Sequence, residues 1–355
     1  MAHVPTSLSD FRAGDILGVP LAQASRIFSG TPAEIHRQWR ELAAQCHPDR
    51  HSGATDANSA FRHLLDLRDA ALGKADADAA LLRDVTFATT DGRHFKLRYL
   101  RCRPFELGCV YIGRTTLAYA IDLAHRDLYE AATERIGGLR FANEYLRRQF
   151  ATSLPAILAR LETADRLVLI LRRDPGLVVL ADLLALQGGQ LDPRHIAWIV
   201  SGLANIACYL TASGLVHGAI DAGTVLVDPA THEVALPSGW FYATETGAAL
   251  HALPEQTARR LPAMLLDHGL ATPAIDLALI RALARTLCGD PSGSRMLHDG
   301  HLPRPFADWL THAPADTAFA DYAGWERARD ASFGKQRFVD LPVTPAEIYP
   351  PLASL

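Results

Sequence analysis

One proline, Pro48, most constrains how the N-terminal part of this chain can fold, because it separates two amphipathic helical runs. The Thr-Pro-Ala-Glu sequence at residues 31–34 has the hydroxyl cap, first-turn proline and carboxylate of a capping box, and therefore begins the first run. That run places apolar side chains on one helical face at Ile35, Trp39, Leu42 and Cys46. The second run, which ends at Gly73, has at helical spacing Phe61, Leu64, Leu65, Arg68 and Leu72. Two such runs predict an antiparallel helical hairpin with Pro48 in its loop.

The tripeptide at the predicted tip is His47-Pro48-Asp49, with His47 and Asp49 exposed on either side of the rigid proline. Residues 10–73 resemble the J-domain family in this motif and its helical context, and Phe61 matches the aromatic residue that usually begins the third long helix. The resemblance implies that the turn, with the basic face before it, docks on a DnaK-class heat-shock chaperone and stimulates ATP hydrolysis. The chaperone-binding residues it implies are His47, Pro48, Asp49, Arg37, Arg40 and Arg50.

Two features depart from the J-domain pattern. The short first helix of the family contains a Leu-Gly-Val stretch, found here at residues 17–19, but its gap to His47 is longer than usual. Residues 24–28 are the competing segment, with a gap shorter than usual, and we favour this second segment. The basic face is also thin, with arginine and histidine where lysine clusters are common, which predicts modest affinity for the chaperone.

The 355 residues predict two domains, at about 100–200 residues per domain. A formal net charge of −4 gives no field that favours nucleic acid or an anionic membrane. The five cysteines form neither a Cys-x-x-Cys pair nor a zinc-type spacing with histidine, which is typical of reduced thiols in the cytoplasm. The N-terminus lacks the basic and apolar regions of a signal peptide, and no apolar run reaches the roughly 18 residues of a membrane span.

Beyond a predicted linker at residues 74–84, the sequence changes from helical to strand-like. Short β-rich runs occur at residues 85–88, 95–102, 107–112, 115–121, 157–161 and 167–171, and one helical run at 141–150. These predict a small antiparallel sheet with one inserted helix. After the Asp-Pro-Gly at residues 174–176 the chain is mostly helical, and Asp192-Pro193 begins a long apolar helix that ends at Gly214.

A long apolar helix, a glycine, Val216-His217 and then a hydrophobic strand is the order around a protein-kinase catalytic loop. Leu253-Pro254-Glu255 matches the family's Ala-Pro-Glu, with Glu255 expected in a buried ion pair, and Asp276 matches the aspartate that begins the central helix. Residues 85–342 therefore resemble a two-lobed protein-kinase fold. The predicted fold class is α+β: a small all-α J-domain hairpin, then an antiparallel-sheet lobe and a mainly helical lobe, with residues 343–355 as an extended tail.

The resemblance allows each catalytic position to be checked, because phosphoryl transfer needs a base, metal ligands and a phosphate clamp. Asp122 stands at the phosphate-binding lysine and Glu144 at the helix glutamate, while His217 is kept and is expected to be a core histidine. The base is replaced by Ala219, the following lysine by Asp221, the metal-binding asparagine by Thr224, and the metal-binding Asp-Phe-Gly by a segment containing Ser238 and Gly239. These replacements predict a pseudokinase with no catalytic residue, no metal site and no cofactor.

The sequence thus predicts a cytoplasmic co-chaperone whose partners are a DnaK-class chaperone and an unknown client protein, without nucleic acid or membrane. One alternative is an atypical kinase or nucleotidyl transferase with rearranged residues, in which Asp221 acts as a relocated base. Another is an interaction scaffold whose helical hairpin no longer contacts a chaperone.

Overall fold

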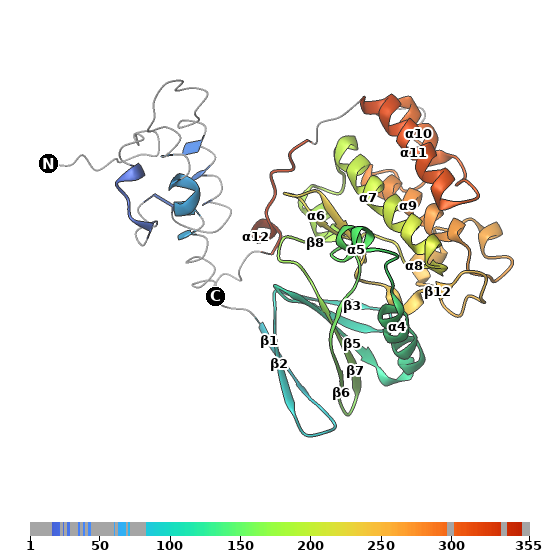
Figure 1. Ribbon diagram of the computed structural model, residues 1–355, viewed down its shortest axis with the longest axis horizontal. Helices are drawn as coiled ribbons and strands as arrows, with labels where there is room; N and C mark the ends of the chain where they lie inside the picture. The colour runs from blue at the N-terminus through green and yellow to red at the C-terminus, as the bar shows by residue number, and fades with distance from the viewer. Residues whose placement is uncertain are drawn as a thin grey trace. The chain divides into compact units, whose positions relative to one another are not determined.

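The computed structural model describes residues 16–21, 24, 27–28, 35, 38–39, 42–43, 60, 63–68, 70–71, 83–296, 302–334 and 339–349. The chain divides into two compact units (Figure 1). Unit 1 comprises residues 1–83 and 349–355, and unit 2 comprises residues 84–348.

The described residues of unit 1 share one apolar core. Its buried members are Ile16, Val19, Ala24, Ile27, Phe28, Ile35, Leu42, Ala43, Leu64, Leu67 and Ala71. Described residues from both candidate segments for the first short helix contribute to this core. The Val19 N–H donates to the Ile16 carbonyl, and the Phe28 N–H donates to the Ala24 carbonyl. The Arg68 guanidinium carbon lies 4.9 Å from the centroid of the Trp39 ring, which adds a cation–π contact beside the core.

Unit 2 begins with sheets, as the sequence predicts. Its main sheet has five antiparallel strands in the order β3-β4-β5-β7-β6. The strands are β3 (Arg101–Phe105), β4 (Gly108–Ile112), β5 (Thr116–Asp122), β6 (Ile157–Glu162) and β7 (Arg166–Arg172). Of the three inner strands, β5 and β7 are almost continuously apolar because both of their faces are buried.

A separate hairpin of β1 (Arg83–Ala88) and β2 (His94–Tyr99) packs on one face of this sheet (Figure 1). Phe87 and Leu97 from the hairpin contact the small side chains Ala118 and Ala120 of β5. The single strand predicted at residues 95–102 is therefore wrong, since the chain bends at Leu100 and its two halves belong to different sheets.

The prediction of a single helix inserted in the sheet is also wrong, because α4 (Arg126–Gly138) precedes α5 (Glu144–Phe150). The longer helix, α4, contacts β6 and β7, and α5 matches the helix expected at residues 141–150. The buried face of α4 carries Tyr129, Ala132, Thr133 and Ile136. Only two of these four residues are large and apolar, so the sequence has a weak hydrophobic period here.

The rest of unit 2 is mainly helical, as predicted. The helices are α6 (Leu180–Leu186), α7 (Pro193–Ala212), α8 (Glu255–Ala258), α9 (Pro273–Leu287), α10 (Arg304–Thr311) and α11 (Ala318–Phe333), with the 3-10 turns η4 (Leu123–His125), η5 (Trp240–Tyr242) and η6 (Ala263–Leu265). Short strands between them are β8 (Val178–Val179), β9 (Leu215–Val216), β10 (Leu226–Asp228), β11 (Glu233–Ala235) and β12 (Thr244–Glu245).

Helix α7 confirms the predicted start at Asp192-Pro193. The Asp192 side chain accepts a hydrogen bond from the Arg194 N–H at 2.8 Å, and Pro193 occupies the first turn. Among the described residues, α7 alone is long and apolar enough to cross a membrane, but 67% of its most apolar window is buried inside the structure. It packs against α9 and α11, as a core helix does.

The extended tail predicted from residue 343 is wrong at its beginning, because α12 spans Pro345–Ile348. The Glu347 carboxylate accepts from the Thr344 N–H at 2.7 Å and from the Thr344 hydroxyl at 2.9 Å. This capping box has the same Thr-Pro-Ala-Glu sequence that predicts a helix start at residues 31–34. The signal for α12 was therefore present in the sequence.

Candidate functional site

The main chain of the segment that resembles a kinase catalytic loop forms hydrogen bonds with a buried carboxylate at the start of α9. Asp276 accepts hydrogen bonds from the backbone N–H groups of His217, at 2.7 Å, and Gly218, at 2.8 Å. Burial raises the pKa of Asp276 to about 6, against the opposing effect of these two donors. Asp276 fixes the course of the loop's main chain.

The His217 side chain, which belongs to this loop, is fully buried. Its Nε2 lies 2.9 Å from the Ser238 carbonyl oxygen, its Nδ1 lies 3.3 Å from the Ala219 nitrogen, and its ring meets the Trp240 ring edge-on. Burial lowers the pKa of His217 to about 4, with the Ser238 contact acting in the opposite direction. A neutral ring with one donating and one accepting nitrogen satisfies both contacts, so His217 joins two backbone segments as a structural residue.

The positions of the kinase base and of its metal-binding asparagine form a closed turn. Ala219 is buried, and its carbonyl accepts a hydrogen bond from the Thr224 hydroxyl at 2.6 Å. The Asp221 carboxylate accepts from the N–H groups of Gly223, at 2.7 Å, and Thr224, at 3.0 Å. Asp221 therefore supports the turn through one carboxylate oxygen, Oδ1, which accepts both hydrogen bonds.

In the segment that the sequence analysis matched to the kinase Asp-Phe-Gly, Ser238 is buried and accepts a hydrogen bond from the Tyr119 hydroxyl. The next residue, Gly239, has φ +83°, and a Cβ there would lie 2.8 Å from Cε1 of His217. A side chain at residue 239 would therefore be strained and crowded, which accounts for the glycine.

Strand β5 presents Tyr119 to this site, and not Asp122 as the sequence suggested. Side chains alternate along a strand, and Ala118 and Ala120 face the β1–β2 hairpin, so Tyr119 faces the other way. Asp122 falls on the hairpin side at the end of the strand, half exposed, and forms an ion pair with Arg166 of β7. Asp122, which the sequence analysis matched to the kinase lysine, therefore lies on the opposite face of β5 from Tyr119.

Glu144 also lies elsewhere than predicted. It begins α5 with a largely exposed side chain, 3.4 Å from the Arg148 guanidinium. The helix that packs on the sheet and contacts η5 is α4, whose buried face carries no carboxylate. Glu130 of α4 is exposed, 3.9 Å from Arg126.

Three aromatic rings lie between the sheet and the helical part of unit 2, and we call them the aromatic cluster: Phe105, Tyr119 and Phe241. The Phe105 ring centroid lies 5.6 Å from that of Tyr119 and 6.1 Å from that of Phe241, and the Tyr119 and Phe241 centroids are 5.4 Å apart. Tyr119 and Phe241 are buried, and burial raises the pKa of the Tyr119 hydroxyl. These rings pack together between strands β3 and β5 and the turn η5.

Glu106, which sequence reasoning missed, fastens the turn between β3 and β4 to the helical part. Its carboxylate accepts hydrogen bonds from the Tyr242 hydroxyl at 3.0 Å and from the Glu255 N–H at 2.8 Å. Two arginines of β3, Arg101 and Arg103, form ion pairs with the buried Asp182 of α6. For Glu106, the sequence offered one signal, which was a carboxylate in the turn that corresponds to the glycine-rich phosphate loop of a kinase.

The buried ion pair expected at Glu255 is instead formed by Arg281 and Asp321. Glu255 is 66% exposed and pairs with Arg259 one helical turn later. The Arg281 guanidinium makes two hydrogen bonds to the Asp321 carboxylate, at 2.9 and 2.7 Å, with both side chains 4% exposed. Since α8 has only four residues and lies at the surface, Glu255 cannot reach the core.

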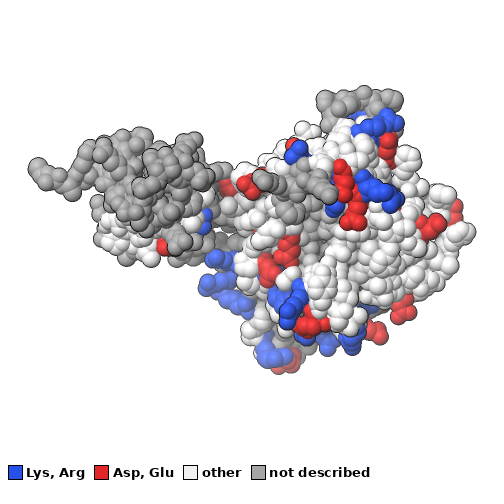
Figure 2. All heavy atoms as spheres, turned by 45° about the horizontal axis from the view of Figure 1, so that its top comes forward, with Lys and Arg blue, Asp and Glu red and all other residues white. Residues whose placement is uncertain are grey.

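The predicted chaperone-binding residues, Arg37, Arg40 and 47–50, lie outside the described residues. Over the part of the chain that the structure describes, no group of three His, Cys, Asp or Glu side chains is placed to hold a metal ion. On the face of the molecule that Figure 2 shows, acidic and basic side chains of the described residues are both present, in keeping with the small net charge.

No family model matches the sequence, and no curated protein is similar to it at the level of sequence. Among solved structures, one that is similar is that of vaccinia related kinase 3, with 14% sequence identity and a TM-score of 0.48. The similarity covers 77% of this chain and 94% of that chain. The order of elements in unit 2, a small antiparallel sheet followed by a mainly helical part, fits the predicted kinase-like fold.

Proposed function

We propose that this protein is a cytoplasmic J-domain co-chaperone whose kinase-like unit 2 is a non-catalytic module that binds a client protein. His47, Pro48 and Asp49 contact a DnaK-class chaperone and stimulate its ATPase, and unit 2 selects what is delivered. The chaperone half of the proposal is supported by the His-Pro-Asp sequence between two amphipathic runs.

The observation that carries the non-catalytic assignment is the hydrogen bond from Tyr119 to Ser238 within the aromatic cluster. A phosphoryl-transfer site places a cation and metal-binding carboxylates at this point, to neutralise the charge of the transferred group. Here a neutral phenol and a neutral hydroxyl bind each other in a buried setting. The neighbouring base position is an alanine, and the one nearby loop carboxylate, Asp221, holds its own turn.

The experiment is a steady-state ATPase measurement on a DnaK-class chaperone with the full-length protein. Wild type should raise the rate severalfold, and His47→Gln should return it to the rate of the chaperone alone. His94→Gln, the same substitution at an exposed histidine of unit 2, is the matched control and should stimulate like wild type. Equal rates for wild type and His47→Gln would contradict the chaperone contact and favour the scaffold alternative.

A further inference from the structure

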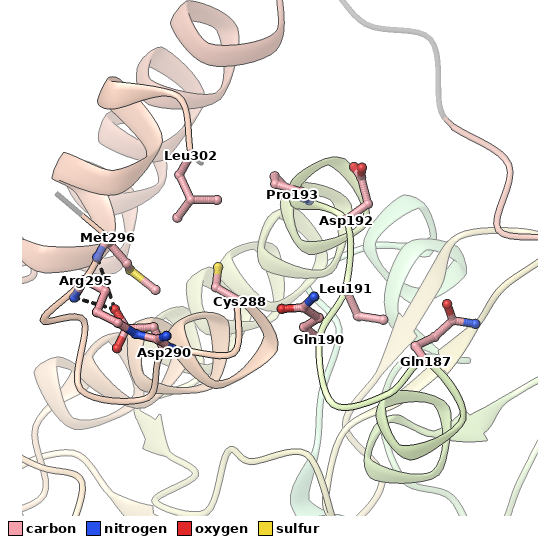
Figure 3. A pocket seen from close by; sticks show the side chains of 10 residues that line it. All are labelled: Gln187, Gln190, Leu191, Asp192, Pro193, Cys288, Asp290, Arg295, Met296 and Leu302. Atoms are coloured by element: carbon pink, nitrogen blue, oxygen red, sulfur yellow. Dashed lines mark hydrogen bonds between the residues drawn. The ribbon is translucent and has the colours of Figure 1, made fainter. Parts of the chain in front are cut away.

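Two cavities of unit 2 differ in whether their charged groups already have partners. The larger, of about 620 Å³, lies between the start of α7 and the end of α9 (Figure 3). Its Asp290 accepts hydrogen bonds from the backbone N–H groups of Arg295 and Met296, at 2.8 and 3.1 Å, and the Arg295 guanidinium donates to the Gly289 carbonyl at 2.8 Å. These two charged groups are therefore engaged within the protein. The chain between two of its lining residues, Met296 and Leu302, lies outside the described residues.

The smaller cavity, of about 450 Å³, is a notch in the connection between α4 and α5 (Figure 1). Two of its six lining residues are half-buried and four are exposed, so it is open to solvent. Such a notch covers little of a small free ligand, whereas it admits a side chain that projects from a larger partner. The lining, all of it within the described residues, consists of Leu139, Arg140, Phe141, Asn143, Glu144 and Arg147.

The connection is fastened to α7, so the notch is present before any partner binds. The Tyr209 hydroxyl of α7 donates to the Arg140 carbonyl at 2.9 Å, and the ring centroids of Phe141 and Tyr209 are 5.7 Å apart. The Arg140 guanidinium is oriented in turn, because its Nη1 donates to the carbonyls of Gly137, at 2.8 Å, and Leu139, at 3.0 Å. A group that is already oriented loses little conformational entropy on binding.

Three side chains of the notch keep donors that have no partner among the described residues. Arg140 uses only Nη1, which leaves its Nε and Nη2 groups. Arg147 makes no hydrogen bond, and its closest carboxylate is Glu144 at 3.9 Å. The Asn143 side-chain oxygen accepts from the Leu146 N–H at 2.9 Å, which leaves the two N–H groups of its amide. Guanidinium donors match the paired oxygens of a carboxylate or a phosphate.

The charge of the lining favours a carboxylate over a phosphate. Two arginines against one glutamate give a formal charge of +1, which a single carboxylate neutralises. A phosphate monoester carries about −1.5 to −2 and would be repelled more strongly by Glu144. The half-buried Leu139 and Phe141 add an apolar wall beside these donors.

From these donors, this charge and this open shape we infer that the notch binds an acidic side chain of a partner polypeptide, next to an apolar residue of the same partner. The carboxylate pairs with the Arg147 guanidinium and with the remaining donors of Arg140 and Asn143. The apolar neighbour packs on Leu139 and Phe141. The inference goes beyond the proposed function, because it assigns a separate interaction surface to unit 2 and does not depend on the chaperone contact.

Fluorescence anisotropy of a labelled peptide tests the inference on the full-length protein at low ionic strength, where exposed charges are screened least. The probe is the amidated peptide Gly-Ser-Glu-Leu-Glu-Leu-Ser-Gly with an uncharged fluorophore at its N-terminus. Its matched control has glutamine in place of both glutamates. The protein should raise the anisotropy of the glutamate peptide saturably and leave that of the glutamine peptide unchanged.

The variant Arg140→Gln/Arg147→Gln should weaken the binding about tenfold, because it removes charge-assisted hydrogen bonds to the carboxylate. The control Arg259→Gln/Arg304→Gln removes the same charge elsewhere and should bind like wild type. Its two side chains are each 68% exposed, against 66% for Arg147. Glu144→Gln should strengthen the binding about threefold, since it takes a negative charge out of the lining. A misfolded variant would not bind more tightly, so this result does not depend on the fold of the arginine variant.

The inference is overturned if the glutamine peptide binds as tightly as the glutamate peptide, or if Arg140→Gln/Arg147→Gln binds like wild type. It is also overturned if the control pair weakens the binding equally, or if Glu144→Gln weakens it. Tighter binding of a peptide with phosphoserine in place of the first glutamate would make the notch a phosphate site and would overturn the choice of a carboxylate. Each of these results leaves the ATPase response to His47→Gln as it was, so this inference and the chaperone contact fail separately.

Discussion

At the scale of single residues, the polar groups around the kinase-like loop form hydrogen bonds with backbone atoms and stabilise the loop. The His217 ring joins the loop to the Ser238 carbonyl, and the Asp221 and Thr224 side chains form hydrogen bonds within the turn. The predicted replacements at the kinase catalytic positions rest on residue identity alone, so the sequence was sufficient to make that prediction. It did not indicate Tyr119 and Glu106, because both act on residues more than 100 positions away along the chain.

The buried His217 should make the stability of unit 2 depend on pH. Its pKa is about 4 in the folded state and about 6.5 in the unfolded state, so its contribution is complete above pH 6.5 and is lost as the pH falls toward 4. The pKa of Asp276 is raised from 3.8 to about 6 in the folded state, so its contribution to stability is complete below pH 3.8 and is lost as the pH rises through 6. We therefore expect wild type to lose stability most clearly just below pH 6.5, and to change less from pH 6 to 4.

The variant His217→Phe isolates the histidine contribution. Its deficit in the free energy of unfolding, measured against wild type by urea denaturation, should shrink by about 2–3 kcal/mol between pH 7.5 and 4.5. The reason is that its unfolded state no longer gains a proton at residue 217. His94→Gln changes an exposed histidine and should show no such trend. A deficit that stays constant across this range would contradict the burial of a neutral ring.

At the scale of elements, hydrophobic periodicity predicted those segments whose pattern is strong. Helix α7 has a long apolar stripe and a capped start, and β5 and β7 are apolar throughout. The pattern failed at α4, whose buried face is half small or polar, and at Leu100, where a bend separates two strands of similar composition. The face on which each β5 side chain lies became clear only from the packing of the β1–β2 hairpin against Ala118 and Ala120.

The β3–β4 hairpin should keep nucleotides out of unit 2. The aromatic cluster fills the space beneath it, and Glu106 ties its turn to Tyr242 and to the start of α8. ATP with magnesium should therefore leave the melting temperature of wild type unchanged, since a ligand stabilises a fold only by binding to it.

The variant Glu106→Ala tests whether the tether holds the hairpin. It removes both hydrogen bonds, and hydrogen exchange at the amides of β3 and β4 should become faster while that of α9 stays unchanged. Glu130→Ala, at an exposed glutamate of α4, is the control. A clear rise in the wild-type melting temperature with ATP and magnesium would favour the atypical-kinase alternative over a non-catalytic module.

At the scale of the whole molecule, the chain divides into two units with separate apolar cores. The two binding functions that we propose are divided between them. The motif that implies chaperone contact belongs to unit 1, and the client binding that we propose belongs to unit 2. Domains of this size usually fold independently when each has its own core. Residues 84–348 alone should therefore melt cooperatively within about 3 °C of the corresponding transition of the full chain, because about 1 kcal/mol shifts the melting temperature of a domain this large by only a few degrees.

This fragment should also separate client binding from chaperone recruitment. In a client-refolding assay with the full-length protein and a DnaK-class chaperone, excess fragment should lower the yield, because it binds client without bringing the chaperone. Full-length His47→Gln is the matched control and should inhibit to the same extent, since its unit 2 is intact and its chaperone contact is lost. Inhibition by His47→Gln but not by the folded fragment would place the client-binding surface in unit 1. A fragment that fails to melt cooperatively would show that the two units depend on each other for stability.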